Sequence, residues 1–185
     1  MKRTGICISI LCLLMAPSVF AQSEKSNFEK IEKTLGTYSN SVGCAFEMDR
    51  KNIVEMDIEG NGNKAFVALF INDADCGGGS GSWTSKLAVL DRHHESPDKG
   101  GIYVLPEMTM PVASGIGLPR FIDRIYSKDG ELWFAGRVHA EKDGNNFPTI
   151  QVQAQIQLLK SEVKLDEKNK RTIYYWKSSK DYQGK

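Results

Sequence analysis

The chain contains only three histidines, and this scarcity limits the catalytic and metal-binding sites that it can form. His93 and His94 are adjacent and Glu95 follows them, so on a strand the two rings would point to opposite faces. A zinc site needs three or four convergent ligands, and no such spacing is present. We therefore predict no metal site and no cofactor, and we interpret residues 91–98 as a solvated hairpin loop.

Several catalytic and phosphate-binding motifs are also missing. Ser82 stands where the G-x-S-x-G elbow of a serine hydrolase around Ser80 would need its second glycine. No lysine directly follows the glycines of residues 77–81, as a phosphate-binding loop would require. The aspartates near positions 73 and 143 do not follow the alternating ligand pattern of an EF-hand. The sequence therefore predicts no catalytic residue.

Long apolar runs are absent except at the N-terminus. Lys2 and Arg3 precede an apolar run over residues 6–20, and Ala21 follows it as a small residue. This order is typical of a secretory signal peptide, and the run is shorter than the roughly 20 residues that span a bilayer. We expect residues 1–21 to be removed, leaving residues 22–185 as a single periplasmic or secreted domain without a transmembrane segment. The alternative is an uncleaved N-terminal anchor.

A large net charge is absent as well. Loss of Lys2 and Arg3 with the signal leaves 22 basic and 23 acidic residues, a balance that argues against a nucleic-acid partner. The charge is uneven, because residues 160–185 hold eight basic and four acidic side chains. This basic tail either faces an acidic partner or an anionic membrane surface, or forms a solvated last strand with a frayed end.

Cysteine is sparse, and two of the four cysteines lie in the predicted signal. Cys44 and Cys76 remain, and their spacing excludes a C-x-x-C redox pair. An exported chain with two cysteines has one connectivity in an oxidising compartment. We predict a structural disulfide between them.

Helical periodicity is limited to one segment, residues 24–36, where Phe28, Ile31 and Leu35 share a face and Gly36 suits the end of the helix. The other regular segments read as strands separated by turns: 53–58, 65–71, 87–90, 102–105, 121–126, 132–138, 150–158 and 172–176. In the strand of residues 150–158, apolar residues alternate with Gln151, Gln153, Gln155 and Gln157. The fold class is therefore mainly β (α+β): an antiparallel β-sandwich, a barrel or one curved sheet with one N-terminal helix.

Two features are candidate binding sites. One is a Gly-rich loop, in which glycine permits positive φ and close approach of another chain, and it ends at an aromatic side chain: Gly78, Gly79, Ser80, Gly81, Ser82 and Trp83. The other is Trp133, whose neighbour Phe134 points to the opposite face of the same strand, together with the glutamine face. Loops on a rigid scaffold and exposed aromatic side chains often carry binding. The alternative is an irregular turn with Trp83 in the core, and surface aromatic residues without a role.

The segments Gly78-Gly79-Ser80-Gly81, Ser85–Leu90 and Asp129–Gly136 resemble a pattern in small exported bacterial proteins that are themselves uncharacterised. In those proteins a Gly-rich loop leads into an L-A-V-[FL] strand, and a later D-G-x-[IL] hairpin carries an apolar strand. The resemblance covers residues 65–138. It implies a β-rich domain of the cell envelope and no catalytic residue.

Two hypotheses for function follow. The first is a periplasmic protein-binding module, such as an inhibitor or immunity protein that neutralises an envelope-acting toxin or enzyme. It rests on predicted export, small size, one disulfide and the absence of a convergent catalytic set. The alternative is an envelope hydrolase acting on glycan or lipid, in which His93, His94 or His139 would converge with carboxylates in one pocket.

Overall fold

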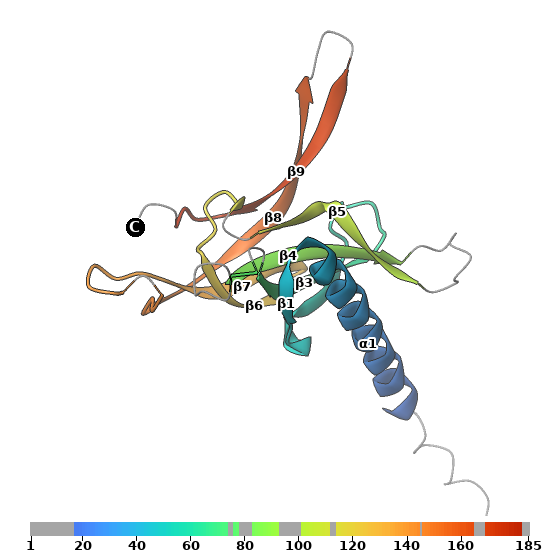
Figure 1. Ribbon diagram of the computed structural model, residues 1–185. Helices are drawn as coiled ribbons and strands as arrows, with labels where there is room; N and C mark the ends of the chain where they lie inside the picture. The colour runs from blue at the N-terminus through green and yellow to red at the C-terminus, as the bar shows by residue number, and fades with distance from the viewer. Residues whose placement is uncertain are drawn as a thin grey trace, which may run out of the picture.

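The computed structural model of the chain describes residues 17–73, 76–77, 83–92, 101–111, 114–144, 146–164 and 169–182. Within these residues lie one α-helix, a short 3-10 helix and nine strands (Figure 1). Their bounds are α1 Pro17–Val42, β1 Cys44–Glu47, η1 Arg50–Asn52, β2 Ile53–Met56, β3 Ala65–Asp73, β4 Trp83–Arg92, β5 Ile102–Pro111, β6 Phe121–Lys128, β7 Glu131–Val138, β8 Ile150–Lys164 and β9 Lys170–Ser178.

The strands form two antiparallel sheets, which confirms the predicted mainly-β fold with one N-terminal helix. The first sheet has the order β1-β3-β4-β5, and β2 also pairs with β3; the second has the order β6-β7-β8-β9. A core of buried side chains from both sheets lies between them, including Leu69, Leu87, Phe134 and Trp176. Of the three predicted arrangements, the structure therefore adopts the sandwich.

The first sheet is buried on both faces. Alternate residues of β3 point to opposite faces, so Val67 and Leu69 enter the core between the sheets while Phe66 and Phe70 meet the helix. Ile31 and Leu35 of α1 complete this second core. The continuous apolar run of β3 is the expected pattern for a strand covered on both sides.

The helix is longer than the sequence predicts. It continues through Gly36 and ends at Val42, so the predicted end at Gly36 is wrong. Gly36 has no positive φ, and a Cβ there would lie 3.6 Å from the Phe46 ring of β1, an ordinary van der Waals distance, so the helix runs through this glycine without a special conformation. The sequence does not predict the strand β1. A bulge at Ala45, whose φ is 56°, interrupts its pairing with β3, so this short strand shows no regular alternation of apolar residues.

The second sheet ends in a long ribbon that projects from the body of the molecule (Figure 1). Pairing of β8 with β7 ends at Gln155, and from Ile156 to Lys164 β8 pairs with β9. The prediction that this strand ends at Leu158 is therefore wrong. The outer residues pair in a two-stranded ribbon that does not need one buried face, so the alternation that marks residues 150–158 stops before the strand does.

Two side chains hold distant parts of the fold together. The amide of Asn52, next to β2, donates to the Asp123 carbonyl oxygen at 3.4 Å and accepts from the Ile125 N–H at 3.2 Å. The indole Nε1 of Trp176 in β9 donates to the Met108 carbonyl oxygen of β5 at 3.1 Å. All three bonds join the first sheet or its flanking residues to the second sheet, and the Trp176 bond fixes the base of the ribbon to the body.

The predicted disulfide is present. Cys44 and Cys76 are bonded, with Cα atoms 5.0 Å apart, and Cys44 pairs with Asp73 on β3. The bond therefore joins edge strand β1 to the segment that leaves β3. The Asp129-Gly130 turn is also confirmed, because both residues have positive φ and Lys128 pairs with Glu131 across them.

Candidate functional site

The outer face of the second sheet carries polar and aromatic side chains that are not part of the core. On β7, Leu132, Phe134 and Val138 point into the core. Trp133, Ala135 and Arg137 alternate with them and therefore point outward. Gln151, Gln153 and Gln155 of β8 pair with Arg137, Ala135 and Trp133, which places the three amides on the same surface. We call this surface, completed by the outward residues of β6, the outer face.

The outer face is ordered in rows across the strands. One row joins Tyr126, Trp133 and Gln155, and the next joins Arg124, Ala135 and Gln153. The Tyr126 hydroxyl lies 3.1 Å from the Gln153 Oε1, and the Gln155 Nε2 donates to Glu131 at 3.0 Å. These contacts run between strands, so the polar side chains are held in place before any partner binds.

Charges frame the aromatic side chains. The Arg137 guanidinium donates to both carboxylate oxygens of Asp123, with Nη2 2.7 Å from Oδ1 and Nε 3.0 Å from Oδ2. Hydrogen bonding to Asp123 raises the pKa of Arg137, so this arginine stays charged. The Lys128 ammonium lies 4.9 Å from the centre of the Trp133 ring, which leaves the indole partly exposed beneath a cation.

A shallow depression of about 470 Å³ lies in this face. Small residues form its floor, because Ala135 and Gly136 stand between larger side chains. Its other lining residues are Asp123, Arg124, Gln151, Val152 and Gln153. Flat shape, amide groups, an exposed indole and arginines are typical of protein-recognition surfaces rather than of an enclosed reaction pocket.

A second depression, of about 320 Å³, lies at one end of the gap between the sheets. Trp83 at the start of β4 lines it with Ile71 and Ser85 from the first sheet and Phe121 from the second. Trp83 is 44% exposed, so the alternative that placed it in the core is wrong. Arg120 stacks over the Phe121 ring at 5.0 Å and adds a cation to the rim.

The structure does not bring the two predicted tryptophans together. Trp133 lies on the outer face of the second sheet, whereas Trp83 lies on the first sheet at the gap between the sheets. The rest of the predicted loop, Gly78, Gly79, Ser80, Gly81 and Ser82, lies outside the described residues. Only Trp83 of that segment can therefore be placed.

The residues named for a hydrolase give no catalytic arrangement in the described part of the chain. His93, His94 and Glu95 lie outside it. His139 packs edge-on against Phe121, with ring centres 5.7 Å apart. Among the described residues, no three side chains of histidine, cysteine, aspartate or glutamate are grouped as metal ligands.

Sequence reasoning missed the β6 contribution to the outer face. Asp123, Arg124 and Tyr126 come from a strand recognised only by its apolar residues. A bulge between Ile122 and Arg124 interrupts strict alternation, so neighbouring positions 123 and 124 are both exposed. The charged pair at 123 and 124, followed by an aromatic residue, was the available signal.

Comparison with protein-family models, curated proteins and solved structures finds no match to this chain. Among the residues that the structure describes, no helix combines the length and the hydropathy needed to cross a membrane.

Proposed function

We propose that this chain is a periplasmic protein-binding module, an inhibitor or immunity protein that neutralises an envelope-acting toxin or enzyme. The observation that carries the proposal is the outer face, where Arg124 lines a depression with small residues and the paired Tyr126 and Trp133 form the neighbouring row. Tryptophan, tyrosine and arginine are the residues that most often dominate binding energy at protein interfaces.

Preorganisation supports a role in binding. The Asp123–Arg137 pair and the Tyr126–Gln153 contact hold long side chains in one arrangement, which lowers the entropy lost when a partner docks. The sheet behind them is fixed by buried Phe134 and Leu132. A rigid, flat, partly aromatic surface fits a folded protein partner better than a small substrate. Location in the periplasm rests on the N-terminal sequence pattern alone.

The test compares the outer face with the gap between the sheets. Trp133→Ala removes the indole, and Ala135→Arg fills the floor of the depression without touching the core. Trp83→Ala is the matched control, because it removes a tryptophan from a different surface. Binding is measured against purified envelope-acting toxins and hydrolases by interferometry, with inhibition of each enzyme as the functional readout.

We expect each outer-face change to weaken binding about 30-fold or more, the effect of losing one interface hot spot. Trp83→Ala should leave the affinity within about threefold. Loss of binding with Trp83→Ala alone would assign the interface to the gap between the sheets. If the protein neither binds nor inhibits any envelope enzyme, the proposed function is wrong.

A further inference from the structure

The outer half of β8 has an open hydrogen-bonding edge. Its pairing with β7 stops at Gln155, and β9 covers the opposite edge from Ile156 onward. In the described part of the chain, no strand pairs with the β7-side edge of residues 157–164. An unpaired strand edge is a template for pairing with another chain.

This open strand is complementary to itself in one antiparallel register. Around Ser161 the order is Leu159, Lys160, Ser161, Glu162, Val163. When two copies pair about a twofold axis at Ser161, Lys160 faces Glu162 of the second copy and Leu159 faces Val163. Opposite charges and apolar side chains therefore meet in the two facing pairs on each side of the centre, and Leu158 faces Lys164 in the pair beyond them.

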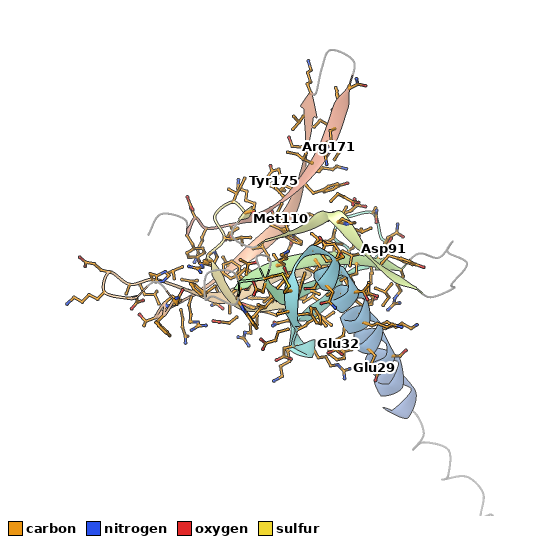
Figure 2. The ribbon with its side chains drawn as sticks, viewed as in Figure 1. Glu29, Glu32, Asp91, Met110, Arg171 and Tyr175 are labelled. Carbon is orange, nitrogen blue, oxygen red and sulfur yellow. A yellow bond between two sulfur atoms is a disulfide. The ribbon has the colours of Figure 1, made fainter. Side chains whose placement is uncertain are left out.

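Exposed apolar side chains mark one side of the same ribbon. Val163 is 40% exposed and Ile173 is 39% exposed, although both belong to regular strands. Ile173 pairs with Ser161 and Tyr175 pairs with Leu159, so these four residues share one side. Figure 2 shows Tyr175 and Arg171 at successive positions along the projecting ribbon, away from the body. Pairing of two ribbons would join these apolar side chains into one continuous stripe.

Charged side chains farther from Ser161, at the two ends of the ribbon, also favour the antiparallel arrangement. Near its outer end the ribbon carries Lys164, Lys170 and Arg171. Glu162, the one acidic side chain among residues 159–164 and 170–175, accepts a hydrogen bond from the Lys170 Nζ at 2.9 Å, so within one copy it neutralises only one of these cations. At its base, a depression of about 380 Å³ beside residues 156–159 is lined by Asp57, Glu59 and Glu131. These three carboxylates form no ion pair within the described residues. In an antiparallel pair, the basic outer end of each ribbon lies beside the acidic base of the other.

We propose that two copies of this chain associate through the open edge of β8, in an antiparallel register centred on Ser161. The second copy contributes the neighbouring strand that the outer half of β8 lacks. The same twofold pairing supplies hydrogen-bond partners to the open edge of each copy. The association is isologous, so it closes at a dimer. The open edge begins where the outer face ends, at Gln155, and the two regions meet at Glu131, which contacts Gln155 and also lines the acidic depression.

Cross-linking tests the register directly. In antiparallel strands, facing Cα atoms lie about 4.5–5.5 Å apart, which suits a disulfide. Ser161→Cys places a thiol opposite its own copy, and oxidation should convert the protein to a covalent dimer. Val163→Cys is the matched control, because residue 163 and its copy would be offset by four positions, roughly 13 Å along the strand. Equal cross-linking of both variants, or none at Ser161→Cys, overturns the register.

Charge exchange tests the pairing without cysteine chemistry. Sedimentation velocity of the purified protein should show a monomer–dimer equilibrium. Lys160→Glu and Glu162→Lys should each weaken the dimer about tenfold, since each puts two pairs of like charges face to face. The double variant restores opposite charges and should return the dissociation constant to within about threefold of the original.

Two further variants serve as controls for net charge. Lys51→Glu and Glu141→Lys make the same changes at exposed positions outside the ribbon and should leave dimerisation unchanged. Thermal unfolding of all variants reports whether the ribbon change disturbs the fold. A protein that stays monomeric at every concentration overturns the proposal. So does a dimer that ignores both reversals, or a monomer that instead binds vesicles of phosphatidylglycerol through Lys160.

Discussion

The two sheets share a core but differ in how many faces they bury. In the first sheet, consecutive residues Leu69 and Phe70 are both buried, one against the second sheet and the other against α1. In the second sheet, Phe134 is buried while its neighbour Trp133 is partly exposed. The first sheet therefore has no free face for recognition over β3 and β4. The second sheet buries one face in the core and leaves side chains of β6 and β7 on the other face exposed.

Among tests of this comparison, Phe70→Ala has the largest expected effect on stability. It opens a cavity between the first sheet and α1, and such substitutions cost about 3–5 kcal/mol of unfolding free energy. Tyr126→Ala on the outer face of the second sheet should cost under about 1 kcal/mol, since it leaves no internal cavity. Urea unfolding measures both. Equal costs would show that the second sheet is also covered on its outer face.

Removal of the Cys44–Cys76 disulfide should have the next largest effect. The bonded residues are 32 positions apart, and a closed loop of this size stabilises a fold by about 3–4 kcal/mol in the chain-entropy estimate. The variant Cys44→Ala/Cys76→Ala should therefore lose this amount in urea unfolding. Addition of a reducing agent should lower the stability of the natural protein and leave the variant unchanged. A variant as stable as the parent would show that pairing with β3 alone holds β1.

Gly136→Ala tests the tight approach of two strands in the second sheet. A Cβ atom there would lie 2.3 Å from the Phe121 carbonyl oxygen, a backbone atom that cannot rotate away. Overpacking of this kind costs about 1–3 kcal/mol. Gly144→Ala is the control, because its Cβ would be 3.8 Å from the Phe147 ring, an ordinary van der Waals distance. Equal stability of the two variants would mean that β6 and β7 separate at little cost.

The smallest effect concerns Asp143 at the end of the second sheet. Its carboxylate accepts hydrogen bonds from the Ala140 N–H at 2.7 Å and the Thr149 N–H at 2.8 Å. These bonds lower the pKa of Asp143 in the folded state, and the bond from Ala140 makes the largest contribution. The stabilisation is therefore present above the unfolded pKa, about 3.9, and is lost as the pH falls through the lower folded pKa.

Asp143→Asn should consequently lower the melting temperature at neutral pH and make little difference in strong acid. Thermal unfolding across pH 2–7 measures the two proteins in parallel. Glu141→Gln is the control, because this exposed neighbour makes no hydrogen bond through its side chain in the described structure. A constant difference between Asp143→Asn and the parent at all pH values would contradict the assignment.

The sequence predicted the elements whose burial has a period. The alternation of Ile150 to Leu158 and the apolar run of β3 gave strands in the right places, because each pattern reflects a definite covering of the sheet. The cysteine count gave the disulfide. The sequence did not predict the elements whose position does not depend on a buried face. β1 pairs with β3 across a bulge and is tied by the disulfide, and the outer part of β8 is held by its pairing with β9.

The candidate site was predicted only in part, for a related reason. Alternation along single strands predicts that Trp133 and Phe134 point to opposite faces and that the glutamines share one face. That Trp133 lies beside Gln155 follows only from the pairing of β7 with β8. The neighbours of Trp133 across β6 depend on the pairing register and on the bulge after Ile122. Those are properties of two strands together, and a single-strand pattern cannot contain them. The projection of the ribbon has the same origin, since it requires β7 to be shorter than β8.

The amide of Asn52 gives the second sheet an asymmetry between its strand edges. By bonding the backbone of β6 on both sides of Arg124, it occupies groups that would otherwise attract a passing strand. Among the described residues, no side chain is seen to bond the open edge of the outer half of β8 in this way. Pairing of this sheet with another chain is therefore blocked along part of β6, whereas the proposed twofold pairing at β8 would stop at two copies.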